Sequence, residues 1–208
     1  MPVQIDVWSD FVCPYCYAAS LSLKALQTTH PVTIRWHAYE LRPEGAPPVP
    51  PAYRARIEQS RPQIDQMFRE QYGVTLKHGP FEIVSRRAHV ANAWACAQDE
   101  AAGERFHDFA FRAFWVDGAD VSSLNVLRAC ATAAGLDADA LEAMLASPEL
   151  SAPFEADVNA GIEQAYAMNL SGVPAMIFQH RYLVPGAVPA GTLRQIVDQI
   201  QSGEVAVR

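Results

Sequence analysis

The sequence predicts an α/β fold in which a large all-helical insertion divides a small sheet into two parts. Three observations support this prediction. Strand, helix and strand patterns follow one another within residues 3–36. Almost wholly helical sequence occupies residues 52–169. Apolar strand sequence then returns at residues 173–184, ahead of a last amphipathic helix, so the sheet is expected to be discontinuous in sequence.

The N-terminal elements follow from apolar periodicity. Residues 3–8 form an apolar run that ends in a polar pair, which is typical of a buried strand. Residues 14–28 contain good helix formers, and residues 32–36 alternate apolar with polar side chains and are rich in β-branched residues. A strand, a helix and a strand in this order predict two parallel strands joined by a right-handed crossover.

The middle of the chain is predicted to be helical. Residues 42–51 hold five prolines and form a loop. Residues 52–169 predict roughly five or six helices, interrupted at residues 73–81. Helix boundaries are signalled by capping residues and by glycines: starts at Ser122-Ser123, Asp137 and Ser147-Pro148, and ends at Gly103 and Gly135.

The C-terminal part completes the sheet. Residues 173–178 and 181–184 predict a hairpin with Gln179-His180 at its turn. Residues 190–202 predict the last amphipathic helix.

Length and organisation together predict two domains. The chain has 208 residues, half of them hydrophobic, which suits one domain that carries a large insertion. We expect a sheet domain formed by residues 1–50 and 165–208, and a helical insertion domain formed by residues 51–164.

Composition excludes several classes of function. A net charge of -7 without a basic patch argues against nucleic acid and anionic membranes as partners. No apolar stretch reaches the ~20 residues of a membrane span, and the N-terminus lacks the pattern of a secretory signal, which predicts a cytoplasmic protein. Four cysteines are too few for a disulfide scaffold. The oligomeric state is not predicted.

Cys13-Pro14-Tyr15-Cys16 is the most informative motif, because it lies between a predicted strand and the start of a helix. Unpaired amides and the helix dipole there stabilise a thiolate at Cys13, and the thiolate is the reactive form. Pro14 suits the first helical position. Cys16 lies one helical turn further on, within reach of a disulfide. We therefore expect a nucleophile at Cys13 and a resolving thiol at Cys16.

A zinc site is the alternative interpretation of two close cysteines. It requires two further ligands at metal-like spacing. Cys96 and Cys130 stand alone in helical segments and are expected to be buried free thiols. No metal is therefore predicted.

The order of a strand, a CxxC helix and a strand, followed by a second half that opens with Gly172-Val173-Pro174, resembles a thioredoxin fold, and the helical insertion resembles its DsbA-like branch. Residues 8–17, WSDFVCPYCY, are similar to the start of FrnE-like members. Residues 40–43 and 85–89 resemble their later segments. This branch is related to 2-hydroxychromene-2-carboxylate isomerases and kappa-class glutathione transferases.

The resemblance implies roles for further residues. Pro174 is expected to follow a cis peptide bond and to face the cysteines. Pro14, Tyr15, Val173 and Pro174 are then the substrate-binding residues, since the backbone before such a proline can pair with an extended substrate.

Asp6 is a candidate proton relay. It projects from the first strand to the face opposite Ile5 and Val7, about where thioredoxin-like proteins bury an acid. Such a carboxylate would take the proton of Cys16. A solvated acid at the end of a strand is the equally weighted alternative.

These residues favour a thiol–disulfide oxidoreductase that works through a mixed disulfide. Its partner would be a protein or a small-molecule thiol or disulfide, with no bound cofactor and with glutathione as a candidate co-substrate. A glutathione-dependent isomerase or transferase of the related classes is the alternative, although those enzymes typically place serine where this chain has Cys13. A binding module or chaperone without catalytic activity is the third interpretation.

Overall fold

The computed structural model describes residues 2–203 and contains a four-stranded sheet in the order β2-β1-β3-β4. Strands β1 (Val3–Ser9) and β2 (Val32–Ala38) are parallel and are joined through α1 (Pro14–Gln27). Strand β3 (Ala175–Phe178) pairs antiparallel with β1 and with β4 (Tyr182–Pro185). The last helix is α8 (Ala190–Ser202). The predicted α/β order, with its N-terminal crossover and C-terminal hairpin, is confirmed.

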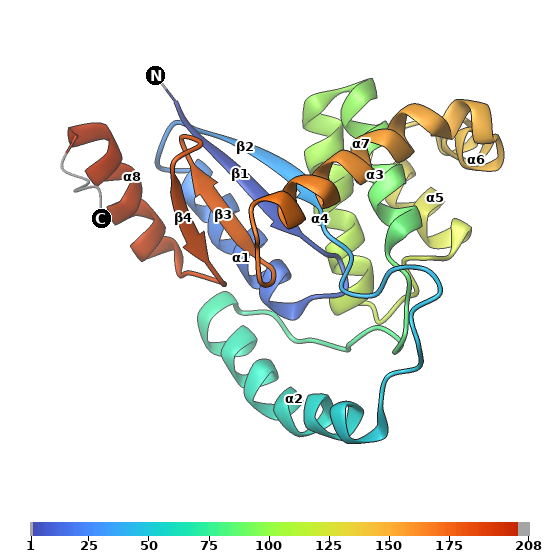
Figure 1. Cartoon of the computed structure of the whole chain (residues 1–208), viewed down its shortest axis with the longest axis horizontal. Helices are drawn as coiled ribbons and strands as arrows, with labels where there is room; N and C mark the ends of the chain where they lie inside the picture. The colour runs from blue at the N-terminus through green and yellow to red at the C-terminus, as the bar shows by residue number, and fades with distance from the viewer. Residues whose placement is uncertain (1, 204–208) are drawn as a thin grey trace.

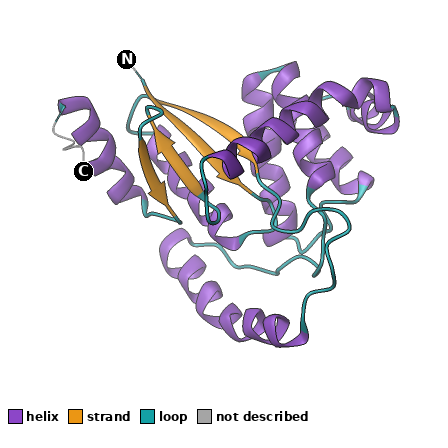
Figure 2. Ribbon diagram, viewed as in Figure 1, coloured by secondary structure: helices purple, strands orange, loops and turns teal. Residues whose placement is uncertain are grey.

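Six helices separate β2 from β3 (Figure 2). They are α2 (Pro51–Tyr72), α3 (Arg86–Gln98), α4 (Glu100–Trp115), α5 (Leu124–Ala134), α6 (Ala138–Ala146) and α7 (Pro148–Ala167). Helix α2 lies apart from the other five, and long loops connect it to β2 before it and to α3 after it (Figure 1).

Helices cover both faces of the sheet (Figure 1). Ile5 and Val7 of β1 belong to the core that contains Leu23 and Leu26 of α1, so α1 covers their face. On the opposite face, the indole of Trp8 donates a hydrogen bond to the carbonyl of Gly161 in α7, at 2.9 Å. Since side chains alternate along a strand, even-numbered residues of β1 face α7 and odd-numbered residues face α1.

The start of α1 is held against the insertion by aromatic contacts. The Tyr17 ring stacks on Phe68 of α2 and on Phe111 of α4, with ring centroids 5.4 and 5.5 Å apart. The indole of Trp115, at the end of α4, donates a hydrogen bond to the carbonyl of Phe11, at 2.9 Å. These contacts fix the loop that precedes the cysteine motif.

Most predicted helix boundaries agree with the structure. Ser123, Asp137 and Ser147 immediately precede α5, α6 and α7, and Gly135 ends α5 with a φ of 83°. The prediction of a helix end at Gly103 was wrong, because α4 runs through it.

Gly103 instead permits a close approach of two helices. A Cβ atom at Gly103 would lie 2.6 Å from the Cα atom of Cys96 in α3. The break that was predicted at Gly103 lies just before it, where the Asp99 side chain accepts a hydrogen bond from the Ala102 amide and caps α4.

We expect Gly103→Ala to destabilise the protein by about 1–3 kcal/mol, because the added methyl group would meet backbone and separate α3 from α4. Gly191→Ala in the first turn of α8 is the matched control, since no atom lies within 4 Å of its added Cβ. The free energy of unfolding in urea, measured for both variants and the wild type, checks this. Equal stabilities of the two variants would contradict the close-packing explanation.

Candidate active site

The cysteine motif lies where β1 leads into α1. Cys13 is the residue immediately before α1, with extended backbone angles, and Pro14 opens the helix. The amides of Cys16 and Tyr17 donate to the Cys13 carbonyl at 3.1 and 3.2 Å, and the Cys13 side chain makes no capping hydrogen bond. Its sulfur is therefore available for chemistry at the positive end of the helix.

Cys16 lies behind Cys13 and is fully buried. Burial is the main cause that raises its pKa well above the ordinary value, and the hydrogen bond and charge of Cys13 raise it further. The Asp10 amide, 3.5 Å from the Cys16 sulfur, and the Ser9 hydroxyl act in the opposite direction. Cys16 is therefore a protonated thiol near neutral pH.

The second half of the sheet brings Val173 to the motif. The sulfur of Cys13 lies 3.7 Å from the Val173 carbonyl oxygen, although 160 residues separate them in sequence. The Val173–Pro174 peptide bond is cis, and Pro174 is buried. Tyr15 is 46 % exposed beside the cysteines. The structure thus gathers the predicted substrate-binding residues around Cys13.

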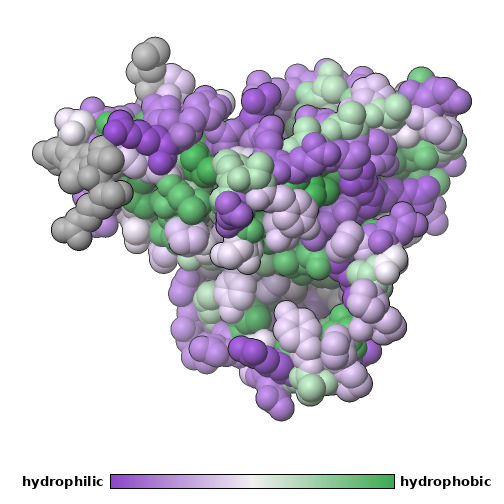
Figure 3. All heavy atoms as spheres, in the orientation of Figure 1, coloured by the Kyte–Doolittle hydropathy of each residue, from purple (hydrophilic) through white to green (hydrophobic). Residues whose placement is uncertain are grey.

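A groove of about 950 Å³ opens over Cys13. It runs between α2 and the loops before and after it, and Figure 3 shows the molecule hollowed beside the α2 lobe. Its walls are largely apolar and include Tyr53 and Ile57 of α2. Arg42, Arg56 and Arg61 also line it, against a single acid, Glu82. The groove therefore carries positive charge in a chain that is negative as a whole.

Asp6 is not brought to the cysteines. It lies on the α7 face of β1, whereas Cys16 belongs to α1 on the other face. Its carboxylate lies 2.9 Å from the Nε2 atom of His37 and 3.1 Å from the Nδ1 atom of His180. The strand alternation was predicted correctly, but α1 covers the face of Ile5 and Val7 rather than the face of Asp6.

Three residues that the predicted site did not include lie near the motif instead. Asp10 is fully buried and accepts hydrogen bonds from the amides of Val12 and Leu41, at 3.3 and 2.7 Å. Its Oδ1 atom lies 3.5 Å from the Nε2 atom of His89. Ser9 follows Val7 on the α1 face of the strand. The alternation of β1 was the signal in the sequence that could have found Ser9.

The other cysteines lie away from the motif. Cys130 is a buried free thiol as expected, and burial raises its pKa to about 12. Cys96 is free but exposed, contrary to the expectation of burial. Within residues 2–203, no cluster of three or more metal-ligating side chains is arranged to hold an ion. No helix in the same range is long and apolar enough to cross a membrane.

The fold agrees with the comparison to known families. Residues 4–198 match the DSBA-like thioredoxin domain, and the chain belongs to this family.

Three relatives illustrate its range. The 2-hydroxychromene-2-carboxylate isomerase of Sphingobium xenophagum is 29 % identical over 181 residues, which cover 85 % of this chain and 89 % of that one. A probable DsbA oxidoreductase of Streptomyces coelicolor superposes with a TM-score of 0.77 at 23 % identity, over 99 % and 93 % of the two chains. The cytosolic disulfide reductase DsbM of Pseudomonas aeruginosa, solved with GSH, superposes with a TM-score of 0.68 at 18 % identity, over 96 % of this chain and 99 % of that one. The relatives thus include oxidoreductases and isomerases.

Proposed function

We propose that the protein is a thiol–disulfide oxidoreductase whose redox centre is Cys13 and Cys16. One observation carries the proposal: a cysteine at the foot of the groove is backed, one helical turn away, by a second, fully buried cysteine that interacts with its sulfur. An enzyme that only binds a thiolate has no use for the second thiol.

The reaction takes two exchanges. The Cys13 thiolate attacks one sulfur of a substrate disulfide, so that a mixed disulfide forms and the other substrate sulfur leaves as a thiolate. Cys16, once deprotonated, attacks the Cys13 sulfur, forms the Cys13–Cys16 disulfide and releases the second substrate thiolate. The substrate gains two electrons and the cysteine pair loses two. In the reverse direction, the same steps oxidise a substrate dithiol to a disulfide.

The groove supports an anionic thiol or disulfide as the partner. Arg42, Arg56 and Arg61 outnumber the one acid in its lining, and arginine binds carboxylates through charge-assisted, often bidentate hydrogen bonds. Glutathione carries two carboxylates and fits this charge. The DsbM relative was solved with GSH, which supports glutathione as a co-substrate here. Tyr15 and Val173, on either side of Cys13, are proposed to contact the bound thiol.

A glutathione-dependent isomerase is the second candidate. The isomerase of Sphingobium xenophagum matches most of this chain at 29 % identity, which favours it. In that reaction glutathione would stay reduced and Cys16 would have no role. The two candidates therefore differ in whether Cys16 ever loses its proton and forms a bond.

Intact-mass measurement after exposure to oxidised glutathione separates the two functions. We expect the reduced protein to lose two hydrogens and to yield a Cys13–Cys16 disulfide in peptide mapping, because Cys16 resolves the glutathione adduct on Cys13. Cys130→Ser is the control and should give the same disulfide, since that thiol is buried in α5 and not in the motif. A protein that keeps both motif thiols reduced in excess oxidised glutathione would refute the redox function.

A further inference from the structure

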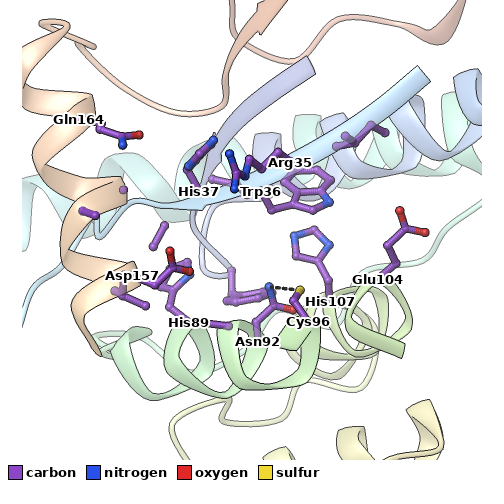
Figure 4. Close-up of a pocket in the computed structure, with 18 of the residues that line it drawn as sticks. Arg35, Trp36, His37, His89, Asn92, Cys96, Glu104, His107, Asp157 and Gln164 are labelled. Carbon is purple, nitrogen blue, oxygen red and sulfur yellow. Dashed lines mark hydrogen bonds between the residues drawn. The ribbon is translucent and has the colours of Figure 1, made fainter. Parts of the chain in front are cut away.

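The groove over Cys13 is not the only hollow in the molecule. A second cavity, of about 470 Å³, lies between the edge strand β2 and helices α3, α4 and α7 (Figure 4). We call it the rear cavity. Neither cysteine of the motif lines it, so it is separate from the proposed redox centre. Its volume falls within the range of about 300–1,000 Å³ that is typical of small-molecule sites.

The mouth of the rear cavity is acidic. Three exposed carboxylates from two helices line it, those of Glu100 and Glu104 in α4 and of Asp157 in α7. One exposed base, Arg35 of β2, stands against them. The groove over Cys13 has the opposite balance, since three arginines there face one acid. The rear cavity therefore favours a ligand of positive charge.

The charges of these acids act together on one residue of the lining. Cys96 of α3 lies at the mouth, and its sulfur lies against Gly103 of α4. The pKa of its thiol is raised to about 11, first by burial of the sulfur and then by the charges of Asp157, Glu104 and Glu100. Acids from α4 and α7 thus make the same side of the cavity negative.

The floor of the rear cavity is buried and carries polar atoms without partners. The Oγ atom of Ser9, the Nε2 atom of His89 and the Oδ1 atom of Asn92 make no hydrogen bond within the described part of the chain. Ser9 and His89 are only 4 % and 7 % exposed. Asn92 uses its amide nitrogen on the Cys96 sulfur, 4.0 Å away, which leaves its oxygen free (Figure 4). Buried polar groups rarely remain unpaired, so these atoms are suited to hold a ligand.

Strand β2 adds backbone groups to the wall. It is an edge strand that pairs with β1 alone. The Pro31 carbonyl and the Tyr39 amide are bonded to β1, so odd-numbered residues turn their backbone groups towards β1 and even-numbered residues turn theirs away. Helix α7 covers this outer edge at Ala38. Ile34 and Trp36 line the cavity instead, so their carbonyl oxygens are further acceptors beside it.

An aromatic face completes the rear cavity. Figure 4 shows the His107 ring beneath Trp36, and the two ring centroids lie 4.0 Å apart. The pKa of His107 is lowered to about 3, mainly by burial, so this imidazole is neutral near neutral pH and does not repel a cation. The face of an indole attracts a cation that lies close to it.

We propose that the rear cavity is a second binding site, whose ligand is a small organic cation that carries several N–H donors, such as an amidinium, a guanidinium or a primary ammonium. The acids at the mouth balance its charge, and the indole of Trp36 contacts it. The unpaired oxygens of Asn92 and Ser9 accept hydrogen bonds from its N–H groups. The site does not depend on the proposed oxidoreductase function.

Two molecules of nearly the same shape test the charge of the ligand. Benzamidine and benzamide share a phenyl ring and a planar head group, which is cationic in the first and neutral in the second. Isothermal titration calorimetry of the reduced protein measures both affinities. We expect benzamidine to bind roughly tenfold or more tightly than benzamide. Equal affinities of the two probes would overturn the proposal.

Indole resonances locate the bound probe. Trp36 lines the rear cavity, whereas Trp115 lines the groove over Cys13. In proton–nitrogen correlation spectra, assigned with Trp36→Phe and Trp115→Phe, benzamidine should shift the Nε1–H resonance of Trp36 and leave that of Trp115 in place. A shift of Trp115 alone, or of neither indole, would mean that the probe does not enter the rear cavity, and the inference would then be wrong.

Asp157→Asn and Glu104→Gln test the acidic mouth. Glu163→Gln is the matched control, because Glu163 is also exposed on α7 but does not line the cavity. We expect each mouth variant to bind benzamidine roughly threefold or more weakly than the wild type, with the affinity for benzamide unchanged. Glu163→Gln should bind both probes as the wild type does. If the mouth variants bind benzamidine as tightly as Glu163→Gln, these acids do not select the cation and the proposed site fails.

Discussion

Cys16→Ser is expected to stop the reaction at the mixed disulfide. Cys13 can still attack a substrate disulfide, but no second thiol lies within reach to release the adduct. The adduct should therefore accumulate to one substrate per protein, while turnover falls to the uncatalysed rate. Intact-mass spectra after trapping with a small-molecule disulfide, together with turnover of an insulin-reduction assay, measure both effects.

The variant Cys13→Ser completes this test. It should abolish the adduct and turnover together, because the remaining thiol of Cys16 is fully buried and protonated. Cys130→Ser serves as the control for loss of a buried thiol and should keep full turnover. Unchanged turnover in Cys16→Ser, with no adduct, would instead support the isomerase function.

The second large effect is expected in the acid stability of the fold. Burial is the main cause that lowers the pKa of His107 from 6.5 to about 3, and electrostatic interactions with His89 and Lys24 lower it further. Between about pH 3 and pH 6.5, the unfolded chain therefore binds a proton at His107 that the folded protein does not. His107 thus contributes to a loss of stability as the pH falls from 6.5 towards 3. At pH 5 this loss amounts to about 2 kcal/mol.

His107→Phe should remove this part of the acid sensitivity. Phenylalanine can keep the stacking on Trp36, where the ring centroids lie 4.0 Å apart, and it binds no proton. The difference in unfolding free energy between pH 7 and pH 5, measured in urea, should shrink by about 2 kcal/mol relative to the wild type. The ring resonances of His107 should show no titration between these pH values. Parallel stability curves for the two proteins would rule out His107 as the source.

Local signals in the sequence were sufficient to predict the helices, the strands and the position of the cysteine pair. The starts of α6 and α7 follow from the side chains of Asp137 and Ser147, which accept hydrogen bonds from the first free amides of these helices. The end of α5 follows from the left-handed backbone of Gly135. Cys13 and Cys16 lie within one helical turn, so their mutual position depends on α1 alone. Such contacts within a few residues can be inferred without knowledge of the tertiary structure.

Long-range packing decided what local patterns could not. Gly103 resembled a helix end, but its role depends on Cys96 in a neighbouring helix. The alternation along β1 separates Asp6 from Ile5 and Val7, yet only the docking of α1 decides which face meets Cys16.

Docking placed α1 on the face of Ile5 and Val7, and left Asp6 beside His37 and His180 on the opposite face. The sequence by itself thus determined the fold, the order of its elements and the closeness of Cys13 to Cys16. Only the tertiary structure decided which polar residues surround that pair, because they come from segments whose relative position depends on how the helices cover the sheet.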